Sequence, residues 1–107
     1  MTNQTPLPIK RPPLAIVAPA RLVAATRAEF RRQAIELVDR AAAEQADGIT
    51  IDLGTTSEVD ASGLGILVLV QKRGRERGLV TRLAHANEPV RRMLILTRLD
   101  YLFEFVH

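Results

Sequence analysis

Hydrophobic residues follow two spacings along the chain, one typical of strands and one typical of helices. From Ile49 to Leu53 apolar and polar residues alternate, which predicts a strand with one buried face. The nearly continuous apolar run from Leu14 to Ala18 predicts a strand that is buried on both faces. The expected strands are 14–18, 49–53, 79–84 and a short final one within 102–106.

Between these strands, apolar residues recur at helical spacing and predict three helices, at 27–46, 62–77 and 87–97. The first has the apolar stripe Phe30, Ala34, Leu37, Val38, Ala41 and Ala42. Thr26 and Glu29 match a capping box at its start. Gly78 is a stop signal for the second helix, and Asn87 is a cap for the third.

This alternation predicts one α/β domain, a small, mostly parallel sheet flanked by helices. Its expected bounds are 14–107. Residues 1–13, with four prolines and no acidic residue, are expected to form a tail or an extension of a sheet edge. In parallel sheets the functional loops lie at the carboxyl ends of the strands, where the next helices begin. We therefore expect the functional surface at residues 60–63, before the second helix.

The composition excludes several classes of function. The chain has no cysteine, and its two histidines are too few and too scattered to suggest a metal cluster. The net charge is +3, but aromatic residues make up only 4%, so nucleic-acid binding is not expected. No apolar run approaches the roughly 20 residues that span a bilayer, and the first residues lack the pattern of a signal peptide. We expect a cytoplasmic protein without membrane insertion, metal or cofactor.

The polar residues before the second helix offer little for catalysis. Ser62 has no histidine or lysine close in sequence to act as its base. Asp60 stands before a helix, where a carboxylate is stabilised by the helix dipole and can accept hydrogen bonds from free backbone N–H groups. We therefore assign no catalytic residue and expect a protein without enzymatic activity.

Three stretches match a known family. The most specific is the hexapeptide at 60–65, Asp-Ala-Ser-Gly-Leu-Gly, and residues 87–92 and 99–103 add to it. Together they resemble a STAS domain, with similarity to the bacterial anti-sigma factor antagonists, over residues 14–106. The resemblance implies a small sheet flanked by helices, in agreement with the alternation of strands and helices.

The resemblance also implies a switch that works by protein contact. In that family the antagonist binds a serine-kinase anti-sigma factor, and phosphorylation of the residue after the motif aspartate breaks the complex. About two negative charges placed at an interface beside Asp60 would act by repulsion and desolvation. Here that position is Ala61, which has no hydroxyl. We expect the standard switch to be lost, with Ser62, rotated by about 100° on the helix, as the candidate substitute phosphoacceptor.

A second departure lies upstream of the motif. Family members often carry a Gly-x-Leu-Asp-like segment after the first strand, whereas this chain has Val23 where the acid would fall. The partner surface is nevertheless expected to be kept. Gly63 and Gly65 allow another backbone to come close. If exposed, Ala61 and Gly63 would let a partner backbone do so; in the alternative, the glycines only pack the helix against a neighbouring element. The expected partner-binding residues are Glu58, Asp60, Ala61, Ser62, Gly63 and Leu64.

The sequence leaves several functions open. The leading one is an anti-sigma factor antagonist that binds a serine-kinase anti-sigma factor and so regulates transcription. The alternative is an accessory subunit of an ABC (lipid) transporter that binds the transporter ATPase, because STAS-like proteins of similar length do so and such a subunit needs no switch. A nucleotide or lipid sensor and a small enzyme are less favoured. The sequence also leaves open whether the chain forms a homodimer.

Overall fold

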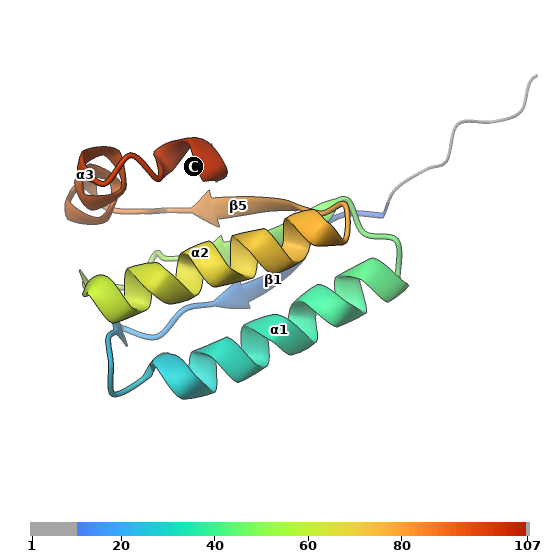
Figure 1. The fold of residues 1–107 in the computed structure, drawn as a ribbon, viewed down its shortest axis with the longest axis horizontal. Coiled ribbons are helices and arrows are strands. Elements are labelled where there is room, and N and C mark those ends of the chain that lie inside the picture. The colour runs from blue at the N-terminus through green and yellow to red at the C-terminus, as the bar shows by residue number, and fades with distance from the viewer. Residues whose placement is uncertain (1–10, 107) are drawn as a thin grey trace, which may run out of the picture.

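A four-stranded parallel sheet organises the part of the chain that the structure, a computed structural model, describes, residues 11–106 (Figure 1). The strand order is β1-β3-β5-β6, and each neighbouring pair is parallel. The strands are β1 (Leu14–Val17), β3 (Gly48–Asp52), β5 (Val80–Ala84) and β6 (Glu104–Val106). The predicted α/β class and the parallel sheet are confirmed.

Helices connect the strands. They are α1 (Arg27–Ala43), α2 (Ala61–Glu76) and α3 (Glu88–Leu96), followed by the short 3-10 helix η1 (Asp100–Leu102). Helices α1 and α2 lie side by side on one face of the sheet, and α3 lies at one end of it (Figure 1). The predicted caps are confirmed for α3, where the Asn87 Oδ1 accepts a hydrogen bond from Val90 N at 3.0 Å, and the stop after α2 has Gly78 at φ +73°.

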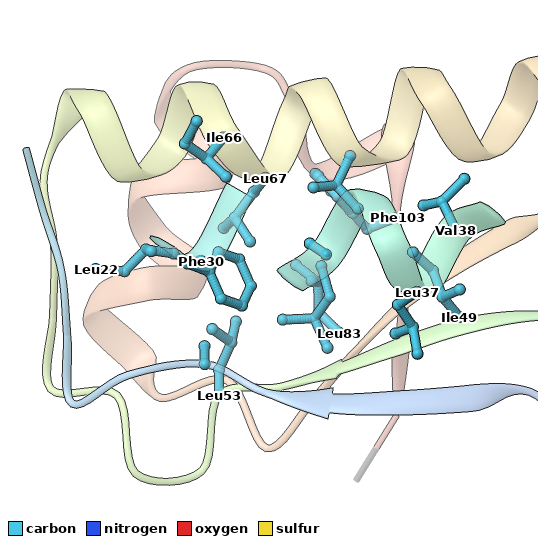
Figure 2. Packing of buried hydrophobic residues seen from close by; sticks show 14 of the residues in the cluster. Leu22, Phe30, Leu37, Val38, Ile49, Leu53, Ile66, Leu67, Leu83 and Phe103 are labelled. Atoms are coloured by element: carbon cyan, nitrogen blue, oxygen red, sulfur yellow. The ribbon is translucent and has the colours of Figure 1, made fainter. Parts of the chain in front are cut away.

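One core fills the space between the sheet and α1 and α2. Ile49, Ile51 and Leu83 point from β3 and β5 into it and are fully buried. Phe30 of α1 and Leu67 of α2 meet them from the helices (Figure 2). The predicted stripe of α1 is confirmed at Phe30, Ala34, Leu37, Val38 and Ala41, which are all buried.

The predicted burial of the first strand on both faces is wrong. Strand β1 is an edge strand that pairs only with β3 in this sheet, and its residues alternate between half-buried and exposed. Val17 is 62% exposed. Helices α1 and α2 cover only the face toward which Leu14 and Ile16 point. An apolar run of five residues, Leu14 to Ala18, does not distinguish an edge strand from a central one.

The predicted capping box at the start of α1 is also wrong. The Thr26 hydroxyl donates a hydrogen bond to Arg21 O at 2.6 Å and accepts one from Val23 N at 3.1 Å. The carboxylate of Glu29 binds Arg32 instead of reaching back to the cap. Thr26 therefore closes the turn that precedes α1, because the carbonyl of Arg21 lies within reach of its hydroxyl.

A second, two-stranded parallel sheet was not predicted. It pairs β2 (Arg21–Leu22) with β4 (Glu58–Val59) beside the start of α2. Strands of two residues are too short to show any periodicity in sequence. Of the expected N-terminal segment 1–13, residues 1–10 lie outside the described part of the chain. Arg11 forms an isolated parallel bridge with Ala46, outside the named strands of the main sheet.

Candidate interaction surface

The predicted functional edge is built from three loops that leave the carboxyl ends of the parallel strands. The Thr56 hydroxyl donates a hydrogen bond to Pro19 O at 2.8 Å, and the Ser57 amide donates one to Ala20 O at 2.8 Å. The side-chain amide of Asn87 donates to Thr56 O at 3.0 Å. These bonds fix the loops after β1, β3 and β5 against one another, and α2 and α3 start from this edge.

Asp60 is the N-cap of α2. One carboxylate oxygen accepts a hydrogen bond from Gly63 N at 2.8 Å, and the other accepts one from Ala24 N at 3.1 Å. The N–H of Gly63 is the main cause that lowers the pKa of Asp60, with smaller contributions from the N–H groups of Ala24 and Ser62 and from the charge of Arg27. Asp60 is therefore ionised at neutral pH and joins α2 to the loop after β2.

Gly63 packs α2 against β2. It is buried, and a Cβ atom at this position would lie 2.0 Å from the backbone oxygen of Leu22. A direct partner contact was expected only if Gly63 were exposed, and it is buried. The geometry explains Gly63 by the close packing of α2 on β2. Leu64 also points inward and is only 9% exposed. Two of the six expected partner-binding residues thus lie beneath the surface.

The other four expected residues lie at or near the surface. Glu58 and Ala61 are exposed, and Asp60 and Ser62 are half-buried. A carboxylate oxygen of Glu58 accepts a hydrogen bond from Arg21 Nε at 2.8 Å, and this partner raises the pKa of the Arg21 guanidinium. The structure brings these residues together at the start of α2 and on the adjoining β4.

Gly65 is a surface residue that was not among the six expected partner-binding residues. It is exposed one turn after Ala61, and a Cβ atom added to it would meet nothing within 4 Å. The four-residue spacing from Ala61 was the available signal, because it places both residues on one face of a helix. The start of α2 therefore presents a smooth face on which another backbone can come close.

The surroundings of Ser62 and of the acidic side chains can be described within the same loops. Within residues 11–106, no hydrogen bond joins the Ser62 hydroxyl to a basic side chain; His85 instead lies with Nδ1 3.2 Å from a carboxylate oxygen of Asp52. The same part of the chain contains no group of three or more histidine, aspartate and glutamate side chains placed to hold a metal ion. Among its helices, none is both long enough and apolar enough to cross a membrane.

Comparison with known proteins adds to this geometry. A protein-family model described as "Mlab, STAS domain" matches residues 13–104. The fold is also similar to that of an anti-sigma factor antagonist from Thermotoga maritima, at 22% identity and a TM-score of 0.71, over 85% of this chain and 77% of that one.

Two further solved structures have the same fold. The unphosphorylated anti-sigma factor antagonist SpoIIAA is 13% identical, with a TM-score of 0.68, over 94% of this chain and 84% of its own. A sulfate transporter family protein from Wolinella succinogenes is 14% identical, with a TM-score of 0.68, over 88% of this chain and 76% of its own. At these identities the likeness concerns the fold.

Proposed function

The chain belongs to the STAS domain family, and from this premise we propose that it is a non-catalytic protein-interaction module of the anti-sigma factor antagonist type. Its proposed partner is a serine-kinase anti-sigma factor. The proposed contact surface comprises Glu58, Asp60, Ala61 and Ser62, extended along α2 by Gly65.

The observation that supports this surface most directly is the open position at Gly65. A glycine inside a helix costs about 1 kcal/mol relative to alanine. Nothing within residues 11–106 lies where its Cβ would be, so packing among the described residues does not explain this cost. Close approach of a partner does explain it, because Ala61 and Gly65 together leave one face of α2 without protruding side chains.

The usual phosphorylation switch is proposed to be absent. Ala61 is the first residue of α2 and is exposed, at the position where the family resemblance places the phosphoacceptor hydroxyl. Ser62 is half-buried and lies about 100° around the helix from it. Partner binding is therefore expected to be controlled by the abundance of the two proteins and not by phosphorylation of this helix.

The contact surface is tested by Gly65→Arg. Affinity capture from the native cell, followed by mass spectrometry, identifies the partner, and binding of the purified pair is then measured. The arginine side chain enters open space and is a better helix former, so we expect unchanged folding but at least about tenfold weaker binding. Ala43→Arg, at the exposed end of α1, is the matched control and should bind normally. Equal binding by both variants would contradict the proposed surface.

The absence of the switch is tested with the captured kinase and ATP. We expect no phosphate on Ser62 by mass spectrometry, and the same affinity for the partner before and after incubation. Phosphate on Ser62 that weakens binding, with no effect on a Ser62→Ala variant, would show that the switch has moved by one residue.

The second candidate is an accessory subunit of an ABC transporter that binds the transporter ATPase. The observation that favours it is the missing hydroxyl at Ala61, because a permanent subunit needs no phosphorylation switch. Capture of an ATPase together with a membrane permease, in place of a kinase, would establish this function. The Gly65→Arg comparison then tests the same surface of α2 against the ATPase.

A further inference from the structure

The outer face of α2 changes character along its length. Its first turns carry Ala61 and Gly65, which belong to the proposed contact surface. Lys72 and Arg75 are exposed further along the helix, and a rotation of about 100° per residue brings all four to within about 80° of one another. The buried positions of α2 lie on the other side. One continuous face therefore leads from the proposed contact surface to a cationic end.

The last turns of α2 hold more positive charge than their surroundings neutralise. Residues 72–77 contain four bases and one acid: Lys72, Arg73, Arg75, Arg77 and Glu76. Arg77 binds Asp39 of α1, with Nη1 3.0 Å from a carboxylate oxygen. Within residues 11–106, no ion pair joins Lys72, Arg73 or Arg75 to a carboxylate. With Asp39 counted, four bases still face two acids at this end of the helix.

Helix α1 treats its charges differently. Together with its C-cap Glu44 it carries four bases and four acids. Arg32 binds both Glu29 and Glu36, and Arg40 binds Glu44. The charges of α1 thus balance along its exposed face, whereas those of α2 do not.

Nothing described within the chain compensates for the close spacing of the α2 cations. Lys72 and Arg75 are three residues apart, a spacing at which like charges destabilise a helix. The helix dipole favours cations in the last turn, which includes Arg75 but not Lys72. Glu76 is four residues after Lys72, which is the weaker order for an ion pair on a helix. Carboxylates of another molecule would relieve this repulsion.

We propose that the cationic end of α2 binds an acidic segment of the same protein partner that contacts Gly65. This inference rests on the proposed function, because it extends the proposed contact surface along one helix. Lys72 and Arg75 lie about 10 and 15 Å beyond Gly65 along the helix axis. The carboxylates of the partner therefore lie at about these distances from the group that packs on Gly65, and they fix the direction in which the partner crosses α2.

The surroundings of the cations favour a protein over other acidic molecules. A membrane surface would require exposed apolar side chains beside the cations. Within residues 11–106, the strongly exposed large hydrophobic side chains lie on β1, α3 and η1, and none is on α2. Nucleic acid would require aromatic or groove-reading elements, and α2 has no aromatic residue.

Charge reversal in the purified complex tests the cationic contact. Lys72→Glu and Arg75→Glu should each weaken binding by about three- to tenfold, mainly through slower association, and the double variant by more. Arg98→Glu is the matched control, because it changes the net charge equally just past the end of α3, which lies at the other end of the molecule from the last turn of α2 (Figure 1). It should change the affinity by less than about twofold. If circular dichroism shows that a reversal variant is unfolded, Lys72→Gln with Arg75→Gln takes its place.

Salt dependence provides a second readout. Raising sodium chloride from about 50 to 300 mM should weaken binding of the unmodified chain more than that of the double variant. Binding to vesicles of phosphatidylglycerol that requires Lys72 and Arg75, with unchanged binding of the protein partner, would overturn the inference and assign the cations to a membrane. Equal loss of partner binding in Arg98→Glu would overturn it too, because net charge would then be the cause.

Comparison with Gly65→Arg separates this inference from the proposed function. If Gly65→Arg loses the partner and the double variant of Lys72 and Arg75 binds normally, the inference is wrong and the proposed function stands. If the double variant loses the partner and Gly65→Arg binds normally, the cationic contact is supported and the proposed contact at the start of α2 is wrong.

Discussion

At the scale of single residues, the two glycines of the first turns of α2 have opposite surroundings. A side chain at Gly63 would collide with the backbone of Leu22, whereas a side chain at Gly65 would enter open space. Gly63 is therefore required by the fold, because it lets α2 lie directly on β2. Gly65 is not, and the open space around it fits the proposed surface on which a partner comes close.

Alanine substitutions should separate these two roles. Gly63→Ala is expected to lower the free energy of unfolding by about 1–3 kcal/mol or more, because the methyl group displaces the Leu22 carbonyl and with it the β2–β4 pair. Gly65→Ala is expected to raise it by about 0.5–1 kcal/mol. Denaturant unfolding followed by circular dichroism measures both. Equal effects would show that the two positions are packed alike.

The N-cap carboxylate should make stability depend on pH. Backbone N–H groups lower the pKa of Asp60 below its ordinary value of 3.8, so the unfolded chain binds this proton more tightly than the folded one. The stabilisation is complete above pH 3.8 and is lost as pH falls from there through the lowered pKa of the folded state. Asp60→Asn keeps a capping oxygen but cannot titrate, so thermal unfolding of the two proteins should differ at pH 6 and converge in acid. If the two proteins differed in thermal stability by the same amount at every pH, the protonation of Asp60 would not be the cause of the pH dependence.

At the scale of elements, the side chain of Asn87 joins α3 to the functional edge by hydrogen bonds. Asn87 caps the helix through Val90 N and also donates a hydrogen bond to Thr56 O in the loop after β3. A change in that loop is thus passed directly to the start of α3. The two hydrogen bonds of Asn87 therefore connect the loop before β4 to the start of α3.

Substitutions of Asn87 should separate the contributions of its two hydrogen bonds to stability. Asn87→Ala removes both and is expected to lower the free energy of unfolding by about 1–3 kcal/mol. Asn87→Asp keeps the oxygen that caps Val90 N but loses the donor to Thr56 O, so its effect should be smaller. Denaturant unfolding measures the loss. If Asn87→Asp were as harmful as Asn87→Ala, the bond to Thr56 O would be the dominant one.

The elements predicted from the sequence are those in which buried hydrophobic positions repeat at a regular spacing. The elements too short to show such a repeat were missed. Helices α1 and α2 were found within a few residues because their buried positions repeat over four turns or more. Strands β2 and β4 were missed because two residues cannot show a repeat. The Asp60 cap was predicted from its place before a helix, but its second bond, to Ala24, depends on a contact across 36 positions. Such contacts, and the open space at Gly65, are properties of the packed molecule and not of any local pattern.

At the scale of the whole molecule, the sheet has one apolar and one polar face. Helices α1 and α2 cover the first, whereas parallel sheets usually have both faces covered. On the second, Arg82 is mostly buried and joins neighbouring strands, with Nη2 2.6 Å from a carboxylate oxygen of Asp47 and Nε 3.6 Å from one of Glu104. Charged side chains thus replace the second helical layer that a larger α/β domain would have.

Because the buried residues are concentrated in the central strands, this architecture predicts that some elements unfold locally more easily than others. Strands β3 and β5 are central and contribute the fully buried Ile49, Ile51 and Leu83, whereas α3 buries only Val90 and Leu94. Amide hydrogen exchange should therefore show β3 and β5 opening only with global unfolding, and α3 opening earlier.

The comparison of α3 with β5 decides the outcome. Protection of α3 that equals that of β5 would show that the domain opens as a single unit, despite the small area that α3 buries.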